Sequence, residues 1–187
     1  MPTKTTTTTT HYHVQKKRRA EFIEEWRHYR RSVIRREDVV LRPTARGMRS
    51  GVYMGWDGER PTRCLDALVH EIDPGVTTTI HRHSWDAQTF IVEGGGWTEV
   101  DGVRYEWQPW DAIHLPAWSW HRHCNTGKKP ARFMSYSSEP MLWTLGMCTL
   151  EDRGHEEVRN LPPRPAFSPG IDGDNPYARR LRRLAKE

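Results

Sequence analysis

Short runs in which apolar and polar residues alternate fill the middle of the chain. From Leu65 to His70 the residues alternate between two faces, and the run ends at the turn sequence Asp73-Pro74-Gly75. A period of two residues is typical of a strand with two different faces. Further runs rich in strand-forming residues follow, separated by turns, over residues 77–83, 88–93, 97–100, 103–107, 111–115, 118–124, 131–137 and 141–150. About eight to ten short strands predict an all-β fold, an antiparallel jelly roll or barrel.

A helical period precedes these strands. Apolar residues recur at intervals of four, three and four positions, at Phe22, Trp26, Tyr29 and Val33. Such spacing places them on one stripe of a helix. The pattern predicts an amphipathic helix within Val14–Asp38, which covers either the barrel or another subunit.

The remaining segments lack a regular period. A polar threonine run predicts disorder at the N-terminus, Pro43 and several glycines predict an irregular arm up to Gly58, and prolines predict an extended C-terminal tail. We expect a short basic helix over Tyr177–Lys186. The expected organisation is a disordered tail at 1–13, a helix and arm at 14–60, a barrel at 61–153 and a proline-rich tail at 154–187.

Composition and charge narrow the class of protein. Hydrophobic residues make up 35% of the 187 residues, and the formal net charge of +5 comes from basic runs near the two ends. Because the central region is nearly balanced in charge, we expect no nucleic-acid partner. Cys64, Cys124 and Cys148 are widely spaced and suit reduced thiols. With no membrane span or signal peptide visible, we expect a cytoplasmic protein.

A single barrel of this size exposes sheet edges and an apolar sheet face. Subunits of symmetric oligomers often cover such surfaces. The amphipathic helix and the long C-terminal tail fit this need, so we expect a homodimer or a higher homo-oligomer.

The candidate chemistry lies in two histidine pairs, His81-x-His83 and His121-x-His123. Residues i and i+2 of a strand point to the same face. If the two strands face each other inside a barrel, the imidazoles converge, and neutral imidazoles bind divalent transition metals. The first pair supplies two ligands from one wall, and His121 and His123 are the candidate donors of the third.

The spacing around these histidines matches two known motifs. The first has a glycine, HxH, an acidic position and a second glycine, and its positions here are Gly75, His81, His83, Gln88 and Gly95. The second has a glycine, Pro-x-Gly, a histidine and an asparagine, and its positions here are Trp110, Pro116, Trp118, His121 and Asn125. The segment resembles the cupin superfamily, although Gln88 replaces a glutamate and two tryptophans replace glycines. The resemblance implies a cupin jelly-roll β-barrel.

Within the cupins, the phrases HRHSWDAQTFIVEGGG and PAWSWHRHCN are similar to those of gentisate 1,2-dioxygenase and its salicylate and hydroxynaphthoate relatives. The resemblance implies that His81, His83 and His121 hold Fe(II). It makes His123 a catalytic or substrate-binding histidine and places Gln88 near the metal. The family commonly holds the substrate carboxylate with a larger residue just after the Gln88 position, where this chain has Thr89.

Nine tryptophans, six of them between Trp85 and Trp120, either wall a pocket or fill the barrel core. The residues we consider as substrate contacts are His70, Trp85, Trp97, Arg104, Trp118 and Trp120.

The resemblance implies an Fe(II)-dependent dioxygenase that cleaves or oxygenates a small hydroxylated aromatic substrate with O2. Mn, Ni and Zn are alternative metals. Two other classes stay open: a metal-binding isomerase, lyase or decarboxylase, and a non-catalytic cupin that binds a small molecule.

Overall fold

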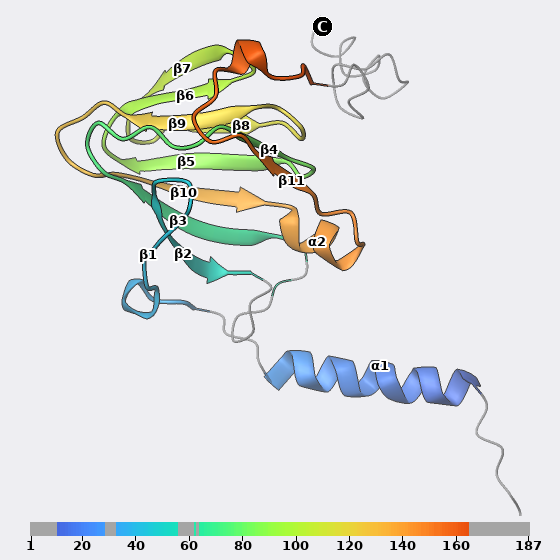
Figure 1. Ribbon diagram of the computed structural model, residues 1–187. Coiled ribbons are helices and arrows are strands. Elements are labelled where there is room, and N and C mark those ends of the chain that lie inside the picture. Colours follow the sequence, from blue (N-terminus) through green and yellow to red (C-terminus); the bar gives the residue numbers. More distant parts are fainter. Residues whose placement is uncertain (1–10, 29–32, 56–61, 63, 165–187) are drawn as a thin grey trace, which may run out of the picture.

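The computed structural model describes residues 11–28, 33–55, 62 and 64–164, and two antiparallel sheets dominate it (Figure 1). The six strands of the first sheet are, in spatial order, β1 (Arg42–Pro43), β2 (Arg49–Met54), β3 (Asp66–Ile72), β10 (Ala131–Ser137), β5 (Ala87–Glu93) and β8 (Ala112–Leu115). The five strands of the second are β11 (Leu150–Asp152), β4 (His81–His83), β9 (His121–Asn125), β6 (Gly96–Val100) and β7 (Val103–Trp107). The helical elements are α1 (His11–His28), η1 (Arg36–Asp38), α2 (Glu139–Thr144) and η2 (Val158–Asn160). This architecture confirms the predicted all-β fold.

Most predicted strands are present with small shifts of their ends. The hairpin predicted around Asp101-Gly102 is formed by β6 and β7, which pair from Gly96 with Trp107 to Val100 with Val103. The aspartate and the glycine both have a positive φ, as a tight hairpin turn requires.

The arm predicted to be irregular contains a strand that the sequence interpretation missed. β2 pairs with β3 from Arg49 to Met54. Gly51 lies within this strand because the chain packs closely against it there: a Cβ at this position would stand 2.6 Å from Cγ1 of Val39. The glycine therefore permits close packing of the chain against the strand and does not interrupt the strand.

The strand predicted over 141–150 was also wrong. Residues Glu139–Thr144 form α2, and only Leu150–Asp152 form a strand, β11. Pro140 lies in the first turn of α2, where a residue without an N–H fits a helix, and the left-handed Gly146 follows its end.

The N-terminal helix is present but shorter at its C-terminal end than predicted. Described residues 33–35 are not helical, and the β-branched Val33 and Ile34 are weak helix formers. Phe22 on α1 is 41% exposed, and the helix stands apart from the barrel in Figure 1. Whether the stripe meets another subunit stays a prediction. The disordered tail predicted at 1–13 was wrong for residues 11–13, which begin α1, and its residues 1–10 lie outside the described residues, as does the basic helix predicted over 177–186.

Within the described part of the chain, no helix has the length and apolar character needed to cross a membrane.

Two buried clusters leave a cavity between the sheets. The larger cluster contains Met48, Ile72, Ile91, Trp107, Ala131 and Phe133, and the smaller contains Trp85, Ala87 and Leu115. Members of both line the cavity, together with the histidines of β4 and β9. The core therefore positions the histidines inside the barrel.

Candidate functional site

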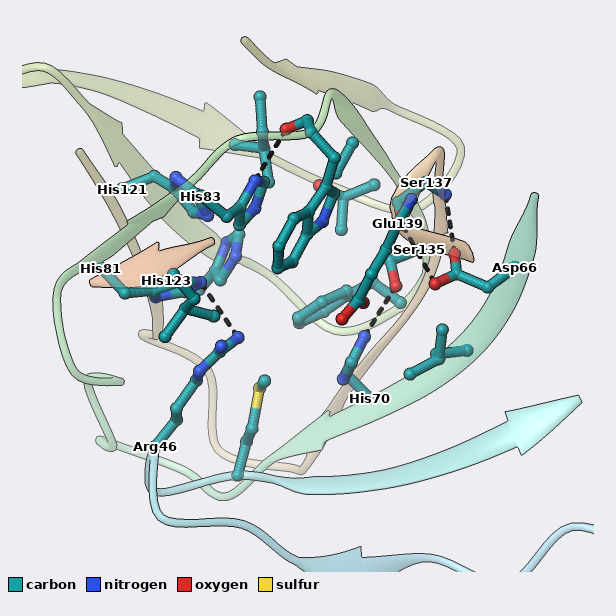
Figure 2. A pocket seen from close by; sticks show the side chains of 18 residues that line it. Arg46, Asp66, His70, His81, His83, His121, His123, Ser135, Ser137 and Glu139 are labelled. Carbon is teal, nitrogen blue, oxygen red and sulfur yellow. Dashed lines mark hydrogen bonds between the residues drawn. The ribbon is translucent and has the colours of Figure 1, made fainter. Parts of the chain in front are cut away.

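Four imidazoles project from one wall of the cavity. β4 and β9 are neighbours in the same sheet and not strands of opposite sheets, and His81 pairs directly with His121. The side chains of His81, His83, His121 and His123 are all buried and line the cavity, which has a volume of about 130 Å³ (Figure 2). The i, i+2 alternation of each strand aims both its histidines inward, as the spacing predicted.

Three of the four histidines can share one cation. One ring nitrogen each of His81, His83 and His121 lies within 4.8 Å of the others. The ring of His121 lies 4.2 Å from that of His81 and 4.7 Å from that of His83, between centroids. Ligands about 2.1 Å from one metal stand about 3–3.5 Å apart, so small ring movements complete the site. The donor set fits a divalent transition metal.

Backbone carbonyls select the tautomer of these three rings. The Nδ1 atoms face carbonyl oxygens at 3.4 Å for His81 and Thr79, 2.7 Å for His83 and Trp85, and 2.9 Å for His121 and Ser119. A carbonyl oxygen only accepts, so each Nδ1 is the protonated nitrogen. The lone pair of each ring is therefore on Nε2, the nitrogen left for a metal.

His123 has the opposite arrangement. Its Nδ1 lies 2.8 Å from Oγ1 of Thr98, which also accepts the indole N–H of Trp107 at 3.0 Å. Among the described residues, His123 is then the acceptor that remains for the Thr98 hydroxyl proton. Nδ1 of His123 accepts, and its Nε2 carries the proton. The fourth histidine is a hydrogen-bond donor, whereas the other three offer lone pairs.

Burial keeps all four imidazoles neutral. Desolvation lowers the pKa of His121 to about 4, with Arg46 adding to the effect. It is also the main cause that lowers the pKa of His81, His83 and His123, followed in each by the repulsion that a second proton on His121 would exert. Neutral rings supply the lone pairs that a metal needs at neutral pH.

Arg46 is a cavity residue that the sequence interpretation missed. Its guanidinium donates to Nε2 of His81 at 3.0 Å. Burial lowers the pKa of Arg46, while the carboxylates of Asp152 and Glu139 raise it. No sequence pattern in the segment predicted to be irregular identified Arg46 as a site residue, because only the folded chain brings the loop before β2 next to His81.

The wall opposite the histidines is polar and partly acidic. Asp66 and Glu139 line it with Ser135 and Ser137, and Figure 2 shows Asp66, Ser137 and Glu139 across the cavity from the histidines and Arg46. The alternation of β3 did contain a signal for Asp66, which shares a strand face with His70.

His70 lies in the cavity lining, as a substrate contact must. It bonds Oγ of Ser50 and Oγ of Ser135, both at 2.7 Å. Burial, followed by the charge of Arg46, lowers its pKa to about 3. The neutral ring therefore links β2, β3 and β10 across the first sheet.

Of the four tryptophans considered as substrate contacts, only Trp85 lines the cavity. Trp85 lines the cavity and stacks on His83 at 4.2 Å with an angle of 4°. Trp97 is covered by Arg104 at 4.1 Å, and Arg82 lies over Trp118 at 5.1 Å and over Trp120 at 4.3 Å. These three tryptophans and Arg104 are outside the cavity lining.

Gln88 does not reach the metal cluster. Its side chain is exposed, whereas its neighbours Ala87 and Thr89 are buried and line the cavity. The pleat of β5 turns Gln88 to the outer face, so we do not include it in the proposed catalytic set.

Two tryptophans at motif positions of glycine have a positive φ, which glycine adopts more easily than other residues. The φ angle is 78° at Trp110 and 60° at Trp118. The backbone N–H of Trp118 donates to the carbonyl of His83 at 2.7 Å, which ties this turn to β4. The motif geometry is kept at the cost of left-handed strain.

The comparisons with known proteins agree with this geometry. Residues 68–137 match the cupin domain family. The chain is 38% identical over 98 residues to gentisate 1,2-dioxygenase 1 of Aquipseudomonas alcaligenes, 38% over 83 residues to 5-aminosalicylate 1,2-dioxygenase of Comamonas sp, and 34% over 99 residues to 5-nitrosalicylic acid 1,2-dioxygenase of Bradyrhizobium sp. These matches cover 52%, 44% and 52% of this chain and 28%, 22% and 46% of the relatives, so the chain spans less than half the length of each.

Solved structures share the fold. Salicylate 1,2-dioxygenase from Pseudoaminobacter salicylatoxidans superposes with a TM-score of 0.53 at 12% identity, over 78% of this chain and 37% of that one. The polyketide cyclase RemF from Streptomyces resistomycificus gives 0.51 at 18% identity, over 62% and 94%. Identities this low show the fold alone.

Residues 68–137 therefore form a cupin domain, and the chain resembles the gentisate, salicylate and hydroxynaphthoate dioxygenases within that family.

Proposed function

We propose that this protein is an Fe(II)-dependent dioxygenase that acts on a single-ring aromatic hydroxy acid. The observation that supports it most is the set of hydrogen-bond partners of the ring nitrogens in the cavity, from which the tautomers follow. Three rings direct lone pairs toward one another, and His123 and Arg46 add hydrogen-bond donors beside them.

The metal would be held by Nε2 of His81, His83 and His121. Three neutral ligands leave the full charge of a divalent ion and open positions for an anionic substrate. A bound Fe(II) would supply Lewis acidity and the electron exchange with O2 that oxygenation of an aromatic ring requires.

Arg46 is proposed to bind the substrate carboxylate. Its guanidinium is planar and permanently charged, which suits a carboxylate better than any other side chain of this cavity. A cation on Nε2 of His81 would remove the acceptor that Arg46 now uses, since both need the same lone pair. The freed guanidinium is then available to the substrate, where Thr89 offers no charge.

His123 is proposed to donate its Nε2 proton to an oxygen of the bound acid. Its ring is fixed from behind by Thr98, so the donor direction is set before the substrate binds. A positioned donor of this kind orients the substrate and stabilises charge that develops on oxygen.

The size and lining of the cavity favour one aromatic ring. A cavity of about 150 Å³ lined by apolar side chains binds benzene, and this one has a volume of about 130 Å³. Trp85, Leu115 and Phe133 supply apolar surface on its walls. A fused two-ring acid would require the walls to move.

The names of the relatives point to the same chemistry. Gentisate, 5-aminosalicylate and 5-nitrosalicylic acid share a 2-hydroxybenzoate core. Because the chain covers only part of each relative, the activity and substrate of the whole protein remain our proposal.

O2 consumption by protein purified anaerobically and loaded with Fe(II) tests this function, with salicylate and gentisate as substrates. We expect uptake with the wild type and with His114→Ala, an exposed histidine outside the cavity, but none with His81→Ala. Full turnover by His81→Ala would contradict the proposal. Conversion of an acid without O2 by the zinc-loaded protein would instead support a lyase, isomerase or decarboxylase.

A further inference from the structure

The wall facing the metal cluster contains two carboxyl groups that the proposed reaction does not use. Asp66 begins β3 and Glu139 begins α2, far apart in the sequence. Asp66 is only 5% exposed, and Glu139 is partly buried, yet both side chains line the cavity.

Neither carboxyl group forms an ion pair with a cation among the described residues. The bonds to Asp66 come from the backbone N–H of Ser137 at 2.8 Å and its Oγ at 3.0 Å. Glu139 accepts the indole N–H of Trp143 at 3.1 Å on Oε1, and Cys148 approaches the same oxygen. Carboxylate oxygens on this wall therefore keep capacity for further donors.

Thr89 provides an independent sign that a polar ligand group reaches this wall. Its side chain is 1% exposed, and its Oγ1 has no hydrogen-bond partner among the described residues. Thr89 pairs across the sheet with Ser135, and both line the cavity. Leaving a buried hydroxyl without a hydrogen-bond partner is unfavourable, so a group inside the cavity is expected to satisfy it.

The two walls thus differ in charge. Arg46 and the metal cluster attract anions on one side, while Asp66 and Glu139 repel anions and accept hydrogen bonds on the other (Figure 2). The charges of Arg46 and Glu139 act on each other across the cavity. A ligand that satisfies both walls needs an acidic end and an end that donates hydrogen bonds.

We propose that the preferred substrate is an amino-substituted aromatic hydroxy acid, whose amino group lies against Asp66, Glu139 and Thr89. This inference rests on the proposed function. An aromatic amine donates two N–H groups, which suit the carboxylates and the Thr89 hydroxyl. A nitro group or a second carboxylate can only accept hydrogen bonds. Its negative oxygens would be repelled by the carboxylates of Asp66 and Glu139. A site built for a donor discriminates strongly against ligands that lack it, because its buried acceptors are then left unpaired.

Anaerobic binding tests the inference without depending on turnover. The dissociation constants of 4-aminosalicylate, 5-aminosalicylate, salicylate and 5-nitrosalicylate are measured on the full chain loaded with Fe(II). We expect one of the two aminosalicylates to bind at least tenfold more tightly than salicylate, and 5-nitrosalicylate to bind more weakly than salicylate.

Glu139→Gln should reduce the ratio of aminosalicylate affinity to salicylate affinity to near one, since it removes the carboxylate charge with little change in side-chain size. The matched control is Glu106→Gln, an exposed carboxylate on β7 outside this cavity, which should leave the ratio unchanged. Thermal melting of Glu139→Gln verifies that the variant is folded. A change of the ratio in the variant, with the fold intact, would not follow from a purely structural role.

The outcomes separate the two proposals. Equal affinity for the aminosalicylates and salicylate, or tighter binding of 5-nitrosalicylate than of the aminosalicylates, would overturn the inference even if oxygen is consumed. An amino preference without oxygen uptake would support the inference and contradict the dioxygenase function. If none of these acids binds, both proposals fall.

Discussion

Arg46 donates a hydrogen bond to Nε2 of His81 at 3.0 Å, although 35 residues separate them in the chain. Nε2 is also the atom that His81 would offer to a metal, because its Nδ1 faces the carbonyl of Thr79. The guanidinium and a metal ion therefore compete for one lone pair. Binding of the metal is expected to release Arg46 toward the cavity.

This competition predicts the behaviour of Arg46→Gln. The variant should lose about ten- to a hundredfold in affinity for salicylate, since a hydrogen bond to a charged group contributes about 1.5–3 kcal/mol. Its affinity for the metal should stay equal or rise, because the competing donor is weaker. Titrations of Fe(II) and of salicylate measure the two effects separately.

Arg42→Gln is the control for this prediction, because Arg42 is an exposed arginine of β1 outside the cavity lining. Unchanged salicylate affinity in Arg46→Gln would contradict the carboxylate-binding role.

The tautomers predict that the four histidines are not equivalent. His121→Ala should remove the metal, whereas His123→Ala should retain it and bind the aromatic acid at least tenfold more weakly. Elemental analysis of anaerobically purified variants, followed by ligand titration, measures both. Loss of metal in His123→Ala with retention in His121→Ala would show that the ligand set is wrong.

Thr98 is predicted to orient His123 through its hydroxyl proton. Thr98→Val should leave the Trp107 N–H without an acceptor and cost about 1–3 kcal/mol in the free energy of unfolding. It should also raise KM for the aromatic acid, because the His123 ring loses its partner.

Thr98→Ser keeps the hydroxyl and should restore both properties. Denaturant unfolding and steady-state kinetics provide the measurements. A serine variant as impaired as the valine variant would indicate that the Thr98 methyl group, and not its hydroxyl, is what matters.

Asp66 predicts a pH dependence of stability. Burial raises its pKa from 3.8 to about 6, and Glu139 adds to the rise, while the hydrogen bonds from Ser137 oppose it. Between these values the folded state binds more protons than the unfolded state, so stability falls as the pH rises from about 4 to 6. Two pKa units correspond to roughly 3 kcal/mol.

Asp66→Asn should remove this decline, which urea denaturation at several pH values can measure. An identical pH profile in the variant would show that the carboxyl group is not destabilised by burial.

The size of the cavity predicts selection against two-ring acids. We expect 1-hydroxy-2-naphthoate to bind at least tenfold more weakly than salicylate, because a volume of about 130 Å³ leaves no room for a second ring. Competition between the two acids for the metal-loaded protein measures this. Equal affinity would mean that the walls open more than the structure indicates.

Local patterns in the sequence were sufficient for the parts of the site that lie within single strands. The HxH spacing determined that His81 and His83 share a face, because strand periodicity depends only on neighbouring residues. The same local approach predicted β3 from its alternation, the β6–β7 hairpin from the Asp101-Gly102 turn, and β10 from its run of strand-forming residues. It failed at residues 141–150, where Pro140 in the first turn of α2 outweighed the apolar character of the segment.

The sequence by itself determined the histidine pairs and the strands that present them. Only the tertiary structure decided that His121 joins the pair while Nε2 of His123 becomes a donor, because the pairing of β4 with β9 places His121 beside His81 and Thr98 of β6 sets the tautomer of His123. It likewise placed Arg46 and Glu139 at one cavity from opposite parts of the chain. Such contacts join residues distant in sequence, and no local period encodes them.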